Sequence, residues 1–332
     1  MTVNRQILLQ SKPAEKLAIT DFALGEAAVP TPGDGEVLLK VRYVSLDAAN
    51  RAWMQGATYR DEITAGTVMA GGALAEVVES NAAGFTPGDI VFADTGWQDY
   101  AVLPTKALQK QPKLEPLTHL LSVYGVAGLT AYHGLLDVGQ PKADETVVVS
   151  AAAGSVGSLV GQIAKIQGCR AVGIAGSDEK CAWLKQELGF DEAVNYKSGP
   201  VHKALKAACP DGIDVYFDNV GGDILEACLF RMNMFGRIAC CGAVSQYDGP
   251  APAHGPRGVP GLIVTKRLTM RGFIMSDFPE GREKALTDLQ AWVQDGRLKV
   301  QEDVLDGLEI LPQALIGLLA GENKGKRMVK VA

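Results

Sequence analysis

The pattern of hydrophobic and polar positions changes near residue 120. Before that point, short apolar runs are separated by turn pairs such as Pro32-Gly33 and Pro87-Gly88. Short runs bounded by Pro and Gly predict strands, here over residues 36–47, 72–80, 89–94 and 100–104. We therefore expect residues 1 to about 120 to form a compact β-barrel-like domain.

After residue 120 the chain alternates between strand-like and helix-like patterns. The alternating units span residues 147–167, 171–188, 193–209, 214–231, 237–242 and 268–275. Such alternation predicts a doubly wound parallel sheet. A third segment begins after Leu298, and we expect its last run, Lys326 to Val331, to return as a strand to the first domain.

A strand, a turn of small residues and a helix follow one another between Val147 and Gly168. The turn contains the pattern Ala152-x-Gly154-x-x-Gly157, with alanine in place of the first glycine of a dinucleotide-binding fingerprint. Gly154 would let the backbone approach a pyrophosphate, and Gly157 would let the helix pack on its strand. The helix, expected over about 156–167, would hold the phosphates at its N-terminus. An ordinary tight β-to-α turn is the alternative interpretation.

The second strand of this unit, residues 171–175, indicates which dinucleotide would bind. An NAD site usually places Asp or Glu at the tip of this strand, but here the tip is Gly176-Ser177. Lys180 lies in the first turn of the next helix, and an uncharged tip with a nearby cation suits the 2′-phosphate of NADPH. Asp178 is the counter-argument because it could bind a ribose hydroxyl. We interpret it instead as a helix-start carboxylate.

The composition of the chain limits which binding partners and which cellular compartment we expect. The 332 residues suggest about two domains, and a formal net charge of −6 argues against nucleic acid or an anionic membrane as a partner. The N-terminus lacks the layout of a signal peptide, and no long apolar run predicts a membrane span. We expect a cytoplasmic protein with reduced thiols, because no C-x-x-C pair occurs among the cysteines at 169, 181, 209, 228, 240 and 241.

Several short segments together resemble one family over almost the whole chain. The family is the zinc-free medium-chain dehydrogenases/reductases of the prostaglandin reductase, alkenal/one reductase and curcumin reductase group. The most specific segments contain SDEK, NYK, DNVGG and SQY. The full set is Tyr43–Arg51, Gly128–Leu135, Val147–Gly168, Gly176–Lys197, Phe217–Gly222, Cys241–Tyr247, Arg271–Phe278 and Gly321–Lys326.

The resemblance implies an α/β chain with two domains. A GroES-like β-barrel domain would cover residues 1–125 and 299–332, and a Rossmann domain with a doubly wound parallel sheet would cover residues 126–298. It also implies NADPH as cofactor and an enone or enal as small-molecule substrate, whose conjugated C=C bond is reduced. Relatives commonly form dimers, so a homodimer is favoured.

The resemblance also implies roles for particular residues. Lys180 and Tyr196 would hold the adenosine 2′-phosphate, and Asn219 would lie by the ribose and pyrophosphate. Tyr247 would bond the cofactor ribose or the substrate near the reacting centre, and it is the one catalytic residue that we expect. The other expected cofactor contacts are Thr130, Gly154, Ser155, Val156, Gly157, Ser177, Cys241, Gly242, Ala243, Ser245, Phe273, Met275 and Asn323.

Two segments depart from the family pattern, and both concern the substrate. The family's D-P-Y-M-R segment is Asp47-Ala48-Ala49-Asn50-Arg51 here, so Ala49 lacks a tyrosine side chain and should open or reshape the pocket. Residues 65–72, AGTVMAGG, also differ from the commoner Gly-Glu pattern. The physiological substrate therefore does not follow from the sequence.

The sequence predicts no metal site. A catalytic zinc needs three protein ligands, yet residues 1–118 contain no Cys and no His, and Ser45 stands where a zinc enzyme would place its first cysteine. The histidines at 119, 133, 202 and 254 have no metal-ligand spacing, and only His133 lies in a segment that we consider for the cleft.

A conjugated enone needs less polarisation than an isolated ketone. Hydride added to its β-carbon leaves an enolate, which a few donors can stabilise, here Tyr247 and the ribose hydroxyl that it would orient. Solvent can then protonate the α-carbon.

The alternative functions are a quinone reductase of the same superfamily and a catalytically silent NADPH-binding protein. The Pro/Gly-rich residues 250–262 precede a strand region that we expect over 263–275. They would either close over substrate or form the dimer interface.

Overall fold

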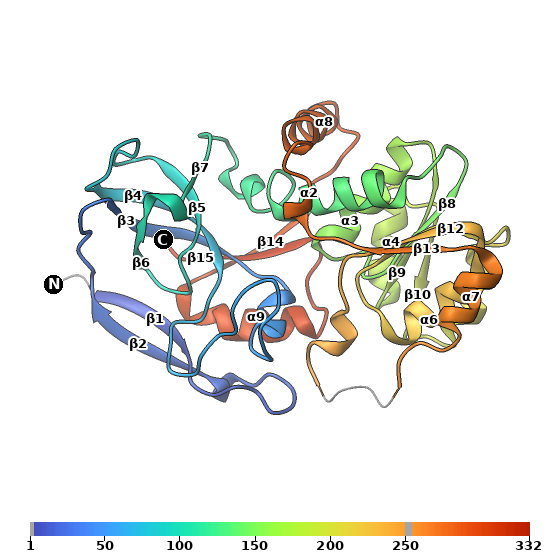
Figure 1. The fold of residues 1–332 in the computed structure, drawn as a ribbon, viewed down its shortest axis with the longest axis horizontal. Helices are drawn as coiled ribbons and strands as arrows, with labels where there is room; N and C mark the ends of the chain where they lie inside the picture. Colours follow the sequence, from blue (N-terminus) through green and yellow to red (C-terminus); the bar gives the residue numbers. More distant parts are fainter. Residues whose placement is uncertain (1–2, 250–253) are drawn as a thin grey trace.

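The computed structural model describes residues 3–249 and 254–332. Figure 1 shows two lobes: one built mainly of strands, and one in which helices surround a parallel sheet. The chain passes from the strand-rich lobe to the helix-rich lobe and returns at its C-terminus. The two-part α/β architecture predicted from the sequence, with GroES-like and Rossmann parts, is therefore confirmed.

The sheet of the second lobe has the strand order β10-β9-β8-β11-β12-β13, and all its neighbouring strands are parallel. In sequence order this is 3-2-1-4-5-6, the order of the doubly wound dinucleotide-binding fold. The strands are β8 (Thr146–Val149), β9 (Arg170–Ala175), β10 (Glu192–Asn195), β11 (Ile213–Asp218), β12 (Met232–Cys240) and β13 (Thr269–Gly272).

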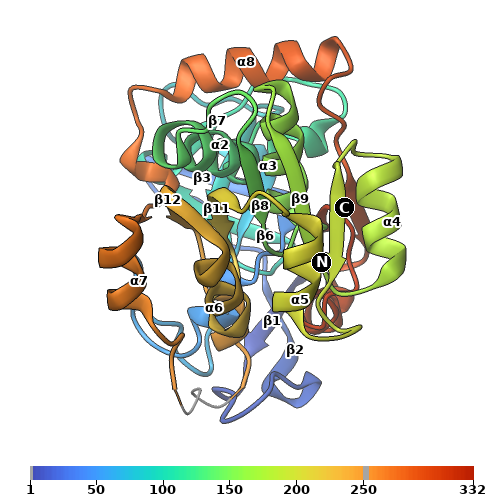
Figure 2. The same cartoon turned by 90° about the vertical axis from the view of Figure 1, so that its right-hand side faces the viewer.

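Helices cover both faces of this sheet, which explains why its central strand is a continuous valine run. Val147 and Val149 of β8 pack into one hydrophobic core, and Val148 packs into another on the opposite face. Figure 2 shows α2, α3 and α8 on one side of the sheet and α5 and α6 on the other. The helices are α2 (Val126–His133), α3 (Ser155–Ile166), α4 (Asp178–Gln186), α5 (Val201–Ala208), α6 (Gly222–Arg231), α7 (Val259–Lys266) and α8 (Arg282–Gln294).

The first lobe is built on a sheet of order β14-β15-β3-β4-β5-β7, with β6 also paired to β3. A separate hairpin of β1 and β2 packs its inner face with Trp97, which is fully buried. The strands are β1 (Val3–Leu9), β2 (Phe22–Ala28), β3 (Glu36–Ser45), β4 (Gly72–Ser80), β5 (Ile90–Asp94), β6 (Tyr100–Pro104), β7 (Gln109–Lys110), β14 (Glu302–Asp306) and β15 (Lys326–Lys330). Two helices belong to this lobe, α1 (Ala49–Ala52) and α9 (Leu311–Leu319).

The C-terminal strand joins the two lobes at the glycine turn. β15 is the strand expected near residues 326–331, and it pairs with β3 in antiparallel register. Just before it, the Gly325 N–H donates to the Ala153 carbonyl at 2.8 Å. The return of the chain therefore places residues of the first lobe against the start of α3.

One predicted strand region is wrong. We expected residues 263–275 to be extended, but Val259–Lys266 forms α7 and the strand spans only Thr269–Gly272. The β-branched pair Ile263 and Val264 favours a strand locally. Tertiary packing decides otherwise, since Ile263 packs on the core beneath α6 and β12. Residues 250–253 of the Pro/Gly-rich segment lie outside the described residues.

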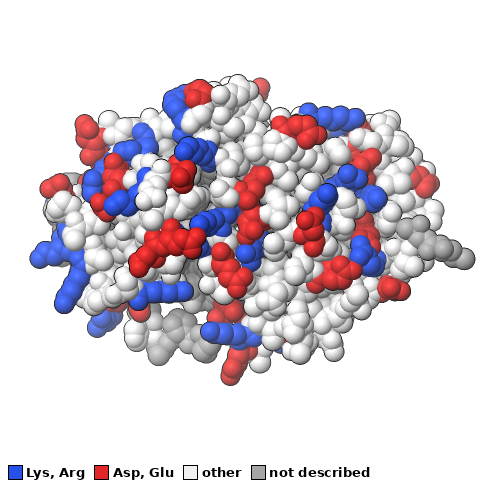
Figure 3. Space-filling view, turned by 180° about the vertical axis from the view of Figure 1, so that it is seen from behind, with Lys and Arg blue, Asp and Glu red and all other residues white. Residues whose placement is uncertain are grey.

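Acidic and basic side chains are interspersed on the face drawn in Figure 3. This mixed pattern accords with a chain of 32 Lys and Arg and 38 Asp and Glu residues. Within the described ranges, no helix has the length and hydrophobicity needed to cross a membrane.

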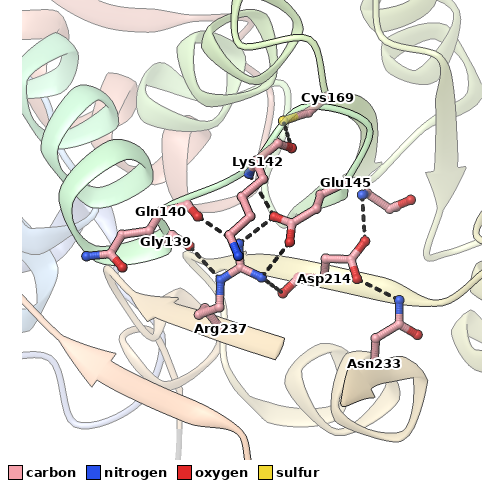
Figure 4. A network of polar contacts seen from close by, with 9 residues as sticks. Gly139, Gln140, Lys142, Glu145, Cys169, Asp214, Asn233 and Arg237 are labelled. Carbon is pink, nitrogen blue, oxygen red and sulfur yellow. Dashed lines mark hydrogen bonds and ion pairs between the residues drawn. The ribbon is translucent and has the colours of Figure 1, made fainter. Parts of the chain in front are cut away.

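A polar network holds the amino ends of β8, β11 and β12 (Figure 4). Arg237 of β12 pairs with Glu145 at 2.5 Å and donates to the carbonyls of Gly139 and Gln140 at 3.1 and 2.7 Å. Asp214 of β11 accepts the Thr146 N–H and the Asn233 amide at 2.9 and 2.7 Å. The network fixes the end of the sheet opposite to the candidate site.

Candidate active site

A cavity of about 1060 Å³ lies between the two lobes, at the carboxyl ends of the parallel strands. In a doubly wound sheet this is where ligands bind, because the strand order reverses there, between β8 and β11. The cavity is lined by residues of the glycine turn, of the loops after β9, β11 and β12, of α1 and of the C-terminal return.

The glycine turn allows α3 to begin directly against β8. Gly154 is the N-cap of α3, and the helix starts at Ser155, one residue earlier than expected. A Cβ at Gly157 would lie 2.4 Å from the Ala151 carbonyl oxygen, so only glycine fits there. Gly157 therefore lets the first turn of α3 pack closely on the turn that follows β8.

The first turn of α3 offers donors that the protein itself does not use. The Oγ of Ser155 is buried, and it has no hydrogen-bond partner in the described part of the chain. Orphaned buried hydroxyls are rare, and the N–H groups at a helix N-terminus favour anions. This end of the cavity therefore fits a pyrophosphate.

The loop after β11 is fastened to the glycine turn. Asn219 donates its amide to the Ser150 carbonyl at 2.8 Å, and its N–H donates to the Ser150 hydroxyl at 2.9 Å. The buried Asp218 carboxylate accepts the N–H groups of Val220 and Gly221 at 3.0 and 2.9 Å. These bonds fix Asn219 in the wall of the cavity beside the start of α3.

Cations gather at the end of the cavity formed by the loop after β9. Lys180 donates to the carbonyls of Gly321 and Asn323 in the C-terminal return, both at 2.6 Å. Burial lowers the pKa of Lys180, and the charges of Lys324, Arg327 and Lys197 lower it further. Because like charges destabilise one another, an anion bound among them would be favoured.

Tyr196 and Lys197 complete this end of the cavity. The Lys197 Nζ lies 5.7 Å from the centre of the Tyr196 ring, and both residues line the cavity. A Cβ at Gly176 would lie 3.2 Å from the Tyr196 ring, so the small tip residue leaves room for that ring. The sequence did not single out Lys197 or Arg327 for the site, although Lys197 ends one family segment and Arg327 directly follows another.

The structure places most of the expected site residues together. Those that line the cavity are Thr130, Gly154, Ser155, Val156, Gly157, Lys180, Tyr196, Asn219, Cys241, Gly242, Ser245, Tyr247, Phe273, Met275 and Asn323. Ser177 and Ala243 do not line it. Ser177 instead caps α4 by accepting the Lys180 N–H at 3.2 Å, and Ala243 donates its N–H to the Tyr247 hydroxyl at 3.1 Å.

The structure also places two further residues discussed in the sequence analysis, Asp178 and His133. Asp178 begins α4, as we interpreted it, and accepts the Asn195 amide at 2.8 Å. His133 does not line the cavity but is buried in the core. Its Nδ1 lies 2.6 Å from an Asp137 oxygen, and its ring stacks on Phe278 with centroids 4.8 Å apart.

The cavity wall under the loop after β12 contains an inert thiol. Burial raises the pKa of Cys241 to about 12. A nucleophilic cysteine needs a lowered pKa, so Cys241 is a packing residue of the wall. Phe273 is similarly packed, edge-on against Phe217 with ring centroids 6.0 Å apart.

Tyr247 lies between the lobes with its position fixed at both ends. Its hydroxyl accepts the Ala243 N–H, and its carbonyl accepts the Gln55 side-chain amide at 2.9 Å. The phenol proton is not needed for either bond, so the hydroxyl can still donate to a bound molecule. The nearby Tyr59 also lines the cavity.

An ammonium group lies beside Ser45, the residue that stands where we expect the first cysteine of a zinc enzyme. Lys326, which is 2% exposed, donates to the Leu46 carbonyl at 2.9 Å and pairs with Asp47 at 2.5 Å. Ser45 donates to the other Asp47 oxygen at 2.7 Å. Although burial raises the pKa of Asp47, Lys326 and Ser45 hold it below its ordinary value. An ammonium and a hydroxyl do not fit a zinc ion, and both oxygens of the one carboxylate are already engaged by them. Residues 3–249 and 254–332 contain no cluster of three His, Cys, Asp or Glu.

The other end of the cavity has an aromatic wall beside Ala49. The Trp53 indole donates to the Tyr59 hydroxyl at 3.2 Å, and the Arg60 guanidinium stacks 4.4 Å above the Trp53 ring. Tyr59 remains 64% exposed at the mouth. The sequence indicated this region only through Ala49, because the pairing of these side chains depends on how the loop folds.

Comparison with known proteins matches both lobes. Residues 5–111 match the N-terminal domain of oxidoreductase, and residues 155–291 match the family described as zinc-binding dehydrogenase. The chain is 45% identical to prostaglandin reductase 1 of Bos taurus over 317 residues, 94% of each chain. It is 40% identical to an NADP⁺-dependent 2-alkenal reductase of Nicotiana tabacum, over 99% of this chain and 98% of the relative. The structure of CurA from Vibrio vulnificus in complex with NADPH shares 40% identity and a TM-score of 0.94, over 99% of each chain.

Proposed function

Because the chain belongs to the zinc-free medium-chain dehydrogenase/reductase family, we propose that it uses NADPH to reduce the C=C bond of α,β-unsaturated ketones and aldehydes. The main support for the proposal is that one cavity contains both an anion site and a phenol that can donate a hydrogen bond. Cations around Lys180 form an anion site at one end, and the Tyr247 phenol lies at the other.

The residues of the anion end suit a phosphorylated dinucleotide. The unpaired Ser155 hydroxyl and the N-terminus of α3 fit the pyrophosphate. Lys180, Lys197 and Arg327 would surround the adenosine 2′-phosphate, whose charge would relieve their mutual repulsion. Bound NADPH would supply the hydride that reaches the β-carbon of the substrate.

The residues at the other end suit an enone. Tyr247 would donate its phenol proton to the carbonyl oxygen of the substrate, where negative charge develops. Its own acceptance of the Ala243 N–H makes the phenol a better donor. The Asp47 carboxylate would not oppose that charge strongly, because Lys326 neutralises it. Water at the open mouth beside Tyr59 would protonate the α-carbon.

This chemistry places no demand on a metal. One matching family is described as zinc-binding, yet Ser45, Asp47 and Lys326 occupy the place of the ligands. The proposal therefore assigns stabilisation of the enolate to hydrogen-bond donors of the chain. The proposed hydride acceptor is a small enone or enal. The relatives described as prostaglandin and 2-alkenal reductases support this choice.

The proposal includes a homodimer formed through the helix-rich lobe. Phe235 and Val264 are 64% and 72% exposed, and Phe230 and Met234 are also exposed beside them on α6 and β12. β13 is the edge strand of the sheet, and its outer edge pairs with no other described strand. An apolar patch beside an open strand edge is a typical protein–protein contact.

Cytoplasmic location is likewise proposed, supported by six cysteines that are all free thiols.

The experiment that tests the proposal is a substrate screen with the purified protein. NADPH consumption would be followed with enals, cyclic enones and quinones, and the products would be identified by mass spectrometry. Saturated ketones or aldehydes support the proposal. Turnover of quinones alone would support a quinone reductase, and tight NADPH binding without any turnover would support a silent binding protein.

A further inference from the structure

Two segments far apart in the sequence meet in a buried ion pair. Arg51, which is 1% exposed, donates from its Nε to an Asp248 oxygen at 3.0 Å. The same oxygen accepts the Leu17 N–H at 2.7 Å. The Nη2 of Arg51 donates to the Glu15 carbonyl at 2.7 Å, so the guanidinium joins three segments of chain.

The ion pair lies directly next to Tyr247 in the sequence. Residues 247–249 follow a short 3₁₀ turn at Val244–Gln246 and belong to no strand or helix. Hydrogen bonds from the first lobe hold them: the Arg51 side chain and the Leu17 backbone N–H donate to Asp248, and the Gln55 side chain donates to the Tyr247 carbonyl. The backbone that carries the phenol is thus fastened to the opposite lobe.

We propose that Arg51 is a positioning residue for Tyr247, acting through Asp248 across the cleft. The inference rests on the proposed role of Tyr247. Arg51 does not line the cavity and so does not touch the substrate. Asp248 does line it, and its carboxylate is neutralised by the pair, which keeps an unpaired negative charge away from the developing enolate.

The physical effect expected of this pair is on the reaction step rather than on cofactor binding. A misplacement of about 1 Å at a reacting centre can cost about 100-fold in rate. The anion end of the cavity is held by different residues, around Lys180 and the start of α3. Loss of the pair should therefore lower kcat while the KM for NADPH stays nearly constant.

The kinetic test compares Arg51→Met in two backgrounds. Arg51→Met should lower kcat for an enone by about ten-fold, which corresponds to ~1.4 kcal/mol in the barrier. In Tyr247→Phe the same change should have less than about a two-fold effect, because the phenol that it positions is absent. Equal factors in both backgrounds would show a general structural effect and overturn the proposal. An unchanged kcat in Arg51→Met would overturn it as well.

A second measurement keeps the inference separate from the role of Tyr247. Hydrogen–deuterium exchange would be compared in Arg51→Met and in Arg5→Met, which breaks an ion pair with Asp99 in the first lobe. Faster exchange at residues 244–249 in Arg51→Met only is the expected result. Unchanged exchange there would overturn the positioning role, whatever the kinetics show.

The two measurements also separate the failure of this inference from that of the proposed function. If Tyr247→Phe alone leaves kcat unchanged, the catalytic role of the phenol fails, and with it the catalytic part of this inference. If Tyr247→Phe lowers kcat but Arg51→Met neither loosens residues 244–249 nor lowers kcat, only this inference fails. Asp248→Asn, which keeps an acceptor for the Leu17 N–H but removes the charge, should match Arg51→Met in both readouts.

Discussion

The ammonium of Lys180 donates to the carbonyl oxygen of Asn323 at 2.6 Å, and so connects the first turn of α4 with the C-terminal return. One residue thereby links the two lobes and supplies charge to the anion end of the cavity. When a 2′-phosphate binds, a charge-assisted contact can replace or join the carbonyl contacts. The expected cofactor specificity depends on this relationship.

Lys180→Ala should raise the KM for NADPH by about 10- to 100-fold, since a charge-assisted hydrogen bond contributes ~1.5–3 kcal/mol. The KM for NADH should change by less than about three-fold, because NADH lacks the 2′-phosphate. Steady-state kinetics with both cofactors measures the difference. Equal changes for the two cofactors would remove Lys180 from the phosphate site.

Tyr247→Phe should lower kcat by about ten-fold, the value of one hydrogen bond of ~1.4 kcal/mol made in the transition state. The aromatic ring remains, so the cavity keeps its shape and the KM for NADPH should stay within about two-fold. Rates with a saturating enone measure the effect. Unchanged rates would reduce Tyr247 to a packing residue.

Gly157→Ala should destabilise the fold by about 1–3 kcal/mol, because overpacking shifts backbone that has no room to move. The added Cβ would lie 2.4 Å from the Ala151 carbonyl oxygen. Gly199→Ala is the matched control, since its Cβ would meet nothing within 4 Å. Thermal unfolding of both variants decides the matter, and a Tm for Gly157→Ala as high as that of the control contradicts the packing argument.

Arg237→Met should destabilise the protein by about 2 kcal/mol at neutral pH, because it leaves a largely buried carboxylate without its partner. Burial raises the pKa of Glu145, but Arg237 and the Lys142 N–H together lower it more, so the pKa lies below the ordinary value of 4.5. A lowered pKa contributes stability above that ordinary value and loses it as the pH falls through the folded-state pKa.

The difference in unfolding free energy between wild type and Arg237→Met should therefore shrink as the pH falls from 6 to about 3. Denaturant unfolding at several pH values measures it. A difference that stays constant over this range would mean that Arg237 acts through its carbonyl contacts with Gly139 and Gln140 alone.

Features with a local cause could be predicted from the sequence. Gly157, Lys180 and the uncharged tip at Gly176 lie within two consecutive strand–turn–helix units, β8–α3 and β9–α4, so their spacing alone places them. The prediction of a strand in the α7 region is wrong because Ile263 and Val264 favour a strand locally, while packing against the core stabilises a helix. Local sequence patterns thus predicted the anion end of the cavity well, but they did not predict the α7 helix.

Features that join distant segments could not be predicted. Arg51 and Asp248 are 197 residues apart, and neither segment indicates that the other is its partner. Lys326 pairs with Asp47 over 279 residues, so the ammonium beside Ser45 appears only when β15 pairs with β3. The substrate end of the cavity also depends on such a pairing, since the Gln55 side chain binds the Tyr247 carbonyl across 192 residues.

Hydride transfer from NADPH to the β-carbon of an enone is the central claim, and isotope labelling tests it most directly. The protein would be supplied with NADPH deuterated at the nicotinamide C4 and with a small alkenone, and the product would be analysed by NMR and mass spectrometry. The account predicts a saturated ketone with deuterium at the β-carbon and a solvent proton at the α-carbon. Deuterium at the carbonyl carbon of an allylic alcohol, or no labelled product from any enone or enal, would contradict it.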